Sequence, residues 1–139
     1  MPAAASSPWT TTCVSAARSD APDCRAEQRS VLQNGQLLAS VTVTVPHDTR
    51  KATLLVQTPF GLSIRSGISL QFDTRPPVRL DVQTCDQGGC YAATLMSDDF
   101  IKTMLASKKL TVVVQALNQR QVAAILSLQG FAIAFQRIR

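Results

Sequence analysis

Four cysteines are the residues of this sequence whose type and spacing are best suited to chemistry. They form two pairs that lie close together in sequence, Cys13 with Cys24 and Cys85 with Cys90. Four cysteines allow three disulfide connectivities, and two local bridges are the preferred interpretation. Such bridges persist in an oxidising compartment, so the spacing favours a protein that acts outside the cytosol.

Metal binding and thiol–disulfide exchange are the other chemistries that these cysteines could support. A structural zinc site usually contains close Cys-x2-Cys pairs, and neither spacing in this chain matches that pattern. A catalytic redox pair usually reads Cys-x-x-Cys before a helix, whereas Cys90 is expected to open a strand. No metal site is predicted, and thiol–disulfide exchange by Cys85 and Cys90 is retained as an alternative function.

The remaining candidate catalytic groups have simpler structural explanations. His47 is the single histidine, and its place after Pro46 predicts an exposed turn residue. Asp98 and Asp99 are expected at the start of a helix, where carboxylates are favoured. The sequence contains no Gly-x-Ser-x-Gly elbow, no His-Glu-x-x-His motif and no phosphate-binding loop. We therefore predict no catalytic residue, no cofactor and no enzymatic activity.

The composition is that of a single globular domain. The chain has 139 residues, of which 45% are hydrophobic and 17% charged, which is enough for a substantial core. No apolar run reaches the length of a membrane span. The net charge is +5, but the cationic residues are scattered rather than clustered. Nucleic-acid binding is therefore not expected, and binding to anionic surfaces is kept as a second alternative.

Alternating apolar residues and turn signals predict mostly β-structure. The strongest alternation is in Leu37–Val45, where one buried face and one wetter face are expected. Asn34-Gly35 before it predicts a tight type I′ hairpin turn. A second hairpin is predicted around Gly88-Gly89, with apolar alternation from Val78 into the turn and from Tyr91 out of it. Cys85 and Cys90 would close the mouth of that hairpin.

One helix is predicted late in the chain, from about 98 to 107, with Ser97 as its N-cap. The last segment, Phe131–Arg139, fits a helix and a strand equally well. Eight or nine short strands with one inserted helix predict an all-β, antiparallel β-sandwich. Residues 1–7 are expected to be a flexible start of the mature chain, and residues 8–139 a single domain.

Several segments, in the same order along residues 9–135, resemble the invasion-associated locus B family of Gram-negative bacteria. The cysteine hairpin and the segment before it are the most specific part of this resemblance, and the region between Cys13 and Cys24 is the least similar. The matching segments are Trp9-Thr10-Thr11-Thr12-Cys13, Cys24, Thr58-Pro59-Phe60-Gly61-Leu62, Gly67, Leu70-Gln71-Phe72-Asp73, Pro77-Val78-Arg79-Leu80, Gln83-Thr84-Cys85, Gly89-Cys90, Leu110-Thr111-Val112, Leu117-Asn118, Ser127-Leu128 and Gly130-Phe131.

The resemblance implies an immunoglobulin-like β-sandwich that is exported to the periplasm, associates with the outer membrane or is secreted after removal of a signal peptide. It also implies a role in host-cell invasion or envelope integrity, with no established catalytic residues. The four cysteines carry over as structural bridges only. The implied partner is another protein of the envelope or of a host surface. As contact surfaces we expect an exposed strand edge or the loops near Phe60 and Tyr91.

Overall fold

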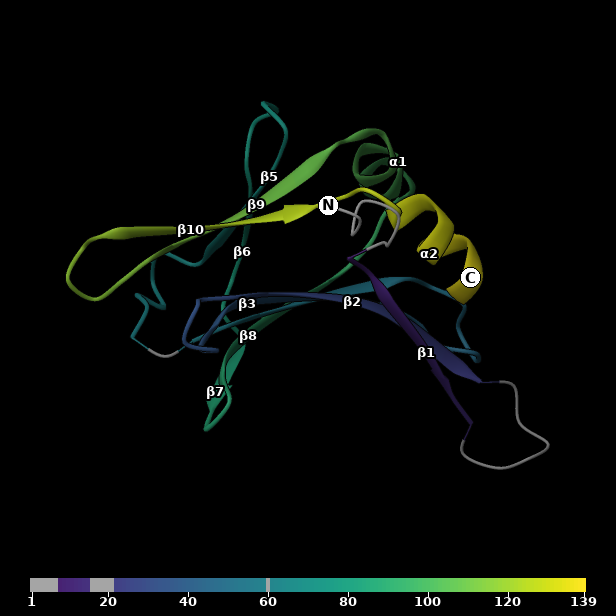
Figure 1. The fold of residues 1–139 in the computed structure, drawn as a ribbon, viewed down its shortest axis with the longest axis horizontal. Coiled ribbons are helices and arrows are strands. Elements are labelled where there is room, and N and C mark those ends of the chain that lie inside the picture. The colour runs from purple at the N-terminus through teal and green to yellow at the C-terminus, as the bar shows by residue number, and fades with distance from the viewer. Residues whose placement is uncertain (1–7, 16–21, 60) are drawn as a thin grey trace.

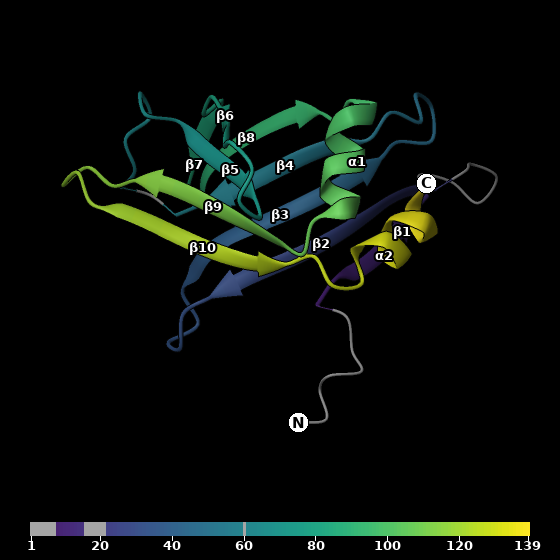
Figure 2. The same cartoon turned by 90° about the horizontal axis from the view of Figure 1, so that it is seen from above.

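Two antiparallel β-sheets pack face to face in a computed structural model of the chain, which describes residues 8–15, 22–59 and 61–139 (Figure 1). One sheet has six strands and the other has four. Both helices lie at the same end of the sandwich (Figures 1 and 2). Their position matters because they enclose the cavity described below. In the described part of the chain, no helix is long and apolar enough to cross a membrane.

The larger sheet has the strand order β1-β2-β3-β4-β8-β7. Its first four strands follow one another along the chain, and its last two form the cysteine hairpin. The bounds are β1 Thr10–Val14, β2 Asp23–Val31, β3 Leu37–Val45, β4 Thr53–Thr58, β7 Thr84–Asp86 and β8 Gly89–Leu95.

The smaller sheet has the order β10-β9-β5-β6, so β10 and β6 are its edges. Its bounds are β5 Ile68–Phe72, β6 Val78–Leu80, β9 Lys109–Gln115 and β10 Gln121–Ser127. The two helices are α1, Asp98–Ala106, and α2, Phe131–Ile138. The predicted all-β antiparallel architecture is confirmed, whereas its immunoglobulin-like character stays a prediction.

The core lies between the sheets and is made of small aliphatic side chains. On β3, the alternating Val41 and Val43 are completely buried, as the sequence pattern predicts. The opposite face of β3 is less exposed to solvent than expected, since Ser40 and Thr42 are only 3% and 7% exposed. These short side chains lie on a central strand between longer neighbours, and Glu27 is registered opposite Thr42 on β2.

The strand predicted before the cysteine hairpin is divided between the two sheets. Val78–Leu80 is β6, which pairs with β5 in the smaller sheet. Only Thr84–Asp86 pairs with β8. The prediction of one continuous strand into the hairpin was therefore wrong, because alternation shows which side chains are buried but not which sheet buries them.

The turn at Asn34-Gly35 connects β2 and β3, but it is not the predicted type I′ turn. Gly35 has a φ of +86°, whereas Asn34 is not in the left-handed region that this turn requires at both positions. The pairing register shifts between Ser30 and Val31. This irregularity accommodates a longer connection than a two-residue turn.

Both helices pack their apolar stripes against the sandwich. Helix α1 begins as predicted, with the Ser97 hydroxyl accepting a hydrogen bond from the Phe100 amide at 3.1 Å. The ambiguous C-terminal segment is helix α2, so the domain contains two helices and not one. Phe131 and Phe135 of α2 are buried and stack on each other, and Trp9 packs on Phe131 at 5.0 Å between ring centroids.

Candidate functional site

The cysteine hairpin at the β7 edge is the first candidate site. Cys85 and Cys90 are paired across the two strands and form a disulfide. Between them, Gly89 has a φ of +129°, a region that favours glycine, and its backbone lies directly against the carbonyl of Thr58. A side chain at this position would collide with Thr58, so the glycine allows the hairpin to pack closely on β4.

Tyr91 lies in a hydrogen-bonded network on the outer face of this hairpin. Its hydroxyl donates to Asp86 Oδ1 at 3.0 Å and accepts from Gln57 Nε2 at 3.4 Å. Gln57 also donates to the Gly88 carbonyl at 2.8 Å, and Asp86 accepts from the Gly88 amide at 2.7 Å. The hydrogen bond to the Asp86 carboxylate raises the pKa of Tyr91, and partial desolvation adds to this effect. Tyr91 is thus held in a defined orientation.

Phe60, the other residue predicted to contact a partner, lies outside the described residues. Its neighbours Thr58 and Pro59 run beside Gly89 of the hairpin. Gly61 accepts a hydrogen bond from the Leu117 amide at 2.8 Å. The chain on both sides of Phe60 is therefore described, and one side of it lies next to the surface that carries Tyr91.

The second disulfide joins β1 to β2 at the opposite flank of the larger sheet. Cys13 and Cys24 are registered opposite each other and are bonded. Next to this bridge, Asp23 Oδ1 binds both the backbone amide and the Nδ1 of His47, at 2.8 and 2.7 Å. These contacts, the backbone hydrogen bond above all, lower the pKa of Asp23. His47 is a turn residue, as predicted, but its pairing with Asp23 rather than with the adjacent Asp48 was not anticipated.

The described residues offer neither a candidate metal centre nor a free thiol. They contain no group of three or more His, Cys, Asp or Glu side chains that could hold a metal ion. All four cysteines are in disulfides. The Asp23–His47 pair lies beside a disulfide, where it ties the end of β2 to the turn after β3. This position indicates that the Asp23–His47 pair has a structural role.

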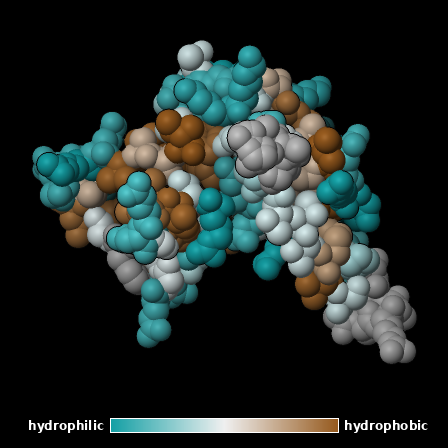
Figure 3. All heavy atoms as spheres, in the orientation of Figure 1, coloured by the Kyte–Doolittle hydropathy of each residue, from teal (hydrophilic) through white to brown (hydrophobic). Residues whose placement is uncertain are grey.

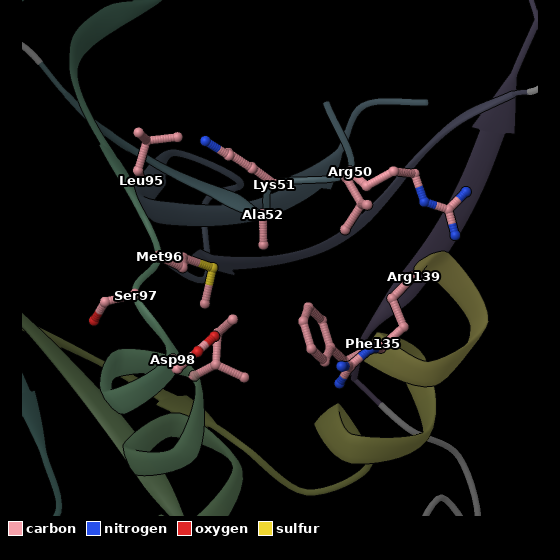
Figure 4. A pocket seen from close by; sticks show the side chains of 11 residues that line it. Arg50, Lys51, Ala52, Leu95, Met96, Ser97, Asp98, Phe135 and Arg139 are labelled. Carbon is pink, nitrogen blue, oxygen red and sulfur yellow. The ribbon is translucent and has the colours of Figure 1, made fainter. Parts of the chain in front are cut away.

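A cavity of about 480 Å³ opens at the helical end of the sandwich (Figure 4). Helices α1 and α2 form two of its sides, and the end of β3, the turn after it and the end of β8 form the others. Its wall includes apolar side chains from all these segments, namely Val45, Ala52, Met96, Ile101 and Phe135.

The mouth of this cavity is predominantly cationic. Arg50, Lys51 and Arg139 line it, and all three residues are exposed. The guanidinium carbon of Arg139 lies 4.9 Å from the centroid of the Phe135 ring, which continues into the apolar wall. Asp98 is the one acidic residue among those lining the cavity. An apolar wall bounded by positive charge is an arrangement suited to binding a small molecule.

Sequence reasoning did not find this cavity. Its lining comes from segments that are distant in sequence. Arg50, in the turn before β4, has a φ of +57°, but nothing in the sequence signals that it lines the same cavity as Phe135 of α2. The juxtaposition exists only in the folded chain.

Both the sequence and the fold of this chain match known proteins. The family model described as invasion associated locus B (IalB) protein matches residues 9–139. The chain belongs to the invasion-associated locus B family.

Relatives support this assignment at the level of sequence and of fold. Invasion protein B homologs from two strains of Brucella abortus are each 30% identical over 132 residues, covering 94% of this chain and 75% of the relative. The crystal structure of invasion associated protein b from Bartonella henselae matches with a TM-score of 0.81 at 18% identity. That match covers 94% of this chain and 90% of the Bartonella chain, and it shows that the two proteins share the invasion-associated locus B fold.

Proposed function

We propose that this invasion-associated locus B protein is an exported, non-enzymatic protein that acts by binding another protein of the cell envelope or of a host surface. The two disulfides are the observation that carries the proposal. Both bridges bind an edge strand to its neighbour, β1 to β2 and β7 to β8. Bridges of this kind stabilise a small domain in an oxidising compartment. The names of the Brucella and Bartonella relatives support an invasion-associated role.

The surface around Tyr91 is one place where such a partner would bind. Tyrosine provides a large contact area at a small cost in conformational entropy, particularly when its orientation is already fixed. Asp86 and Gln57 fix it here. Phe60 follows the segment that packs on the hairpin, and a role for it in partner contact remains part of this proposal.

The outer edge of β10, which pairs with no other strand in the described part of the chain, is a second contact surface. The Leu128 amide donates to Lys108, and the Ala116 amide donates to Arg120. Since hydrogen-bonded pairs alternate along an antiparallel ladder, the backbone groups of Ala123 and Ile125 point away from β9. The strand contains no charged residue or proline that would discourage pairing, and Ile125 is 63% exposed. Figure 3 shows apolar surface over this part of the molecule.

A free-thiol count tests the export part of the proposal. Protein exported through its native signal, then denatured without reduction, should contain no free thiol. Detection of all 4 cysteines as thiols would contradict an oxidising destination. An insulin-reduction assay separates the structural role from thiol–disulfide exchange, because turnover above background would require a reducible bridge.

Partner capture from envelope extract tests the Tyr91 surface. Phe60→Ala and Tyr91→Ala should each reduce capture, whereas the control Ile133→Ala, an exposed residue on α2, should not. Unchanged capture by both Phe60→Ala and Tyr91→Ala would remove this surface from the proposal.

A proline substitution tests the β10 edge separately. Ala123→Pro removes an outward-pointing amide and should block strand addition while changing stability by only about 1 kcal/mol. The control Ala124→Pro removes an amide that bonds to β9 and should cost about 3 kcal/mol or more. Urea denaturation measures both. Capture that survives Ala123→Pro would exclude pairing at this edge.

A further inference from the structure

We propose that the cavity between α1 and α2 binds an alkyl carboxylate, with the chain against the apolar wall and the carboxylate at the cationic mouth. This binding activity is separate from the protein contacts proposed above, because the cavity lies at the helical end of the sandwich and not at the hairpin (Figures 1 and 4).

The size and the wall of the cavity suit an alkyl chain. Its volume of about 480 Å³ lies within the range of roughly 300–1,000 Å³ that is usual for small-molecule sites. In Figure 4, the side chains of Met96, Ala52 and Phe135 point into the open space. Met96 is flexible and polarisable, and such side chains adapt to irregular apolar ligands. Displacing water from the apolar part of this wall by a hydrocarbon chain is favourable.

The mouth supplies positive charge that the described chain does not neutralise. The two salt bridges between described residues are His47–Asp23 and Arg79–Asp81. Neither one involves Arg50, Lys51 or Arg139. Counted over side chains alone, these three cations and the carboxylate of Asp98 leave a net charge of +2 around the opening (3 − 1). A cleft with apolar walls and charge of one sign attracts a ligand of the opposite sign.

The relation between Arg139 and Phe135 indicates how the two ends of the ligand would be oriented. The guanidinium carbon lies 4.9 Å from the centroid of the Phe135 ring. Positive charge and apolar wall are therefore contiguous at this point. A carboxylate bound to Arg139 would place the first carbons of its alkyl chain on the aromatic ring, and the guanidinium can bind both carboxylate oxygens.

The charges favour an anionic head group over a cationic or neutral one. A cationic amphiphile would be repelled by Arg50, Lys51 and Arg139. A neutral head group would leave these charges unpaired and would gain only the apolar contact. The alkyl carboxylate matches the wall and the mouth together.

Methyl NMR of methionine tests the proposal directly. The chain has 3 methionines, of which Met96 lines the cavity and Met104 is completely buried in the core. Titration with sodium decanoate, below its micelle concentration, should shift the Met96 methyl signal saturably and leave Met104 unchanged. Acetate, decyl glucoside and decyltrimethylammonium serve as the probes that lack the chain, the charge or the correct sign. Each should bind more weakly than decanoate.

Charge variants locate the head group. The double variant Arg50→Gln/Arg139→Gln should weaken decanoate binding about tenfold or more. The matched control Lys108→Gln/Lys109→Gln removes the same net charge from exposed residues outside the cavity and should change binding less than twofold. Circular dichroism and thermal unfolding verify that both variants fold.

Three results would overturn the proposal. Absence of a saturable Met96 shift would show that the cavity binds no alkyl carboxylate. Equal binding of decanoate and decyl glucoside would reduce the site to an unselective apolar cavity. Equal weakening by the cavity and control variants would attribute the affinity to the net charge of the whole protein.

Discussion

Glycine at position 89 illustrates how a single residue permits the cysteine hairpin to lie on the sheet. Its positive φ and its contact with the Thr58 carbonyl both exclude a side chain. Gly89→Ala should therefore cost about 3 kcal/mol or more, through backbone strain and steric displacement. The control Gly35→Ala has a φ of +86° but no atom near its new Cβ, and it should cost about 1 kcal/mol. Urea denaturation with the disulfides intact measures the difference, and equal costs would refute the steric explanation.

The Tyr91–Asp86 hydrogen bond makes a prediction about pH. Since the carboxylate raises the pKa of Tyr91 above 10.0, its contribution to stability is present below that value and is lost as pH rises through the folded pKa. Asp86→Asn should lower the pKa of Tyr91. The chain has 1 tyrosine, so an ultraviolet titration reports this residue alone. The control Asp81→Asn, at a carboxylate paired with Arg79, should leave the midpoint unchanged.

At the scale of elements, the two bridges should contribute unequally to stability. The bonded cysteines are separated by 11 positions in the first bridge and by 5 in the second. In the chain-entropy model, a bridge that closes a longer loop stabilises the protein more. Cys13→Ala/Cys24→Ala should therefore lower the free energy of unfolding by about 3 kcal/mol, and Cys85→Ala/Cys90→Ala by about 2 kcal/mol. Thermal and urea unfolding of the two variants measure both values. A larger loss for the shorter loop would indicate that native contacts of the hairpin, rather than loop closure, dominate.

Elements with one clear periodicity were predicted well from the sequence. The alternation of Leu37–Val45 identified β3, and Ser97 identified the start of α1. The C-terminal segment was ambiguous because Phe131 and Phe135 belong to both the two-residue and the helical pattern. Its packing against Trp9 resolves that ambiguity, and this contact joins opposite ends of the chain. A long-range contact of this kind decides between helix and strand, but it cannot be recognised from the local sequence pattern.

At the scale of the whole molecule, the sequence indicated both disulfides and, through its resemblance, the family. It did not indicate that Val78–Leu80 belongs to the smaller sheet or that a cavity lies between the helices. Both features depend on which surfaces meet after the sheets pack. The cavity lining is brought together only by that packing. Each lining residue taken alone has an ordinary pattern of exposure.

The packing of one sheet on the other depends on a polar contact that the apolar pattern did not reveal. Gln28 of β2 is only 8% exposed and points into the sandwich. Its Nε2 donates to the Ser127 carbonyl at 2.7 Å, and its Oε1 accepts from the Ser127 amide at 3.0 Å. Trp9 Nε1 donates to the same carbonyl at 3.1 Å. These bonds satisfy the free edge of β10 at its last residue and join the two sheets.

Gln28→Met, which preserves volume and removes both hydrogen bonds, should therefore destabilise the protein by about 2–3 kcal/mol, because it leaves the Ser127 amide without its acceptor. The control Gln83→Met removes one exposed bond to the Ala93 carbonyl and should cost about 0.5 kcal/mol or less. Hydrogen exchange at the Ser127 amide should accelerate in the first variant and not in the second. If both variants were equally stable, the apolar core alone would hold the sheets together, and Gln28 would serve only to fill space at their margin.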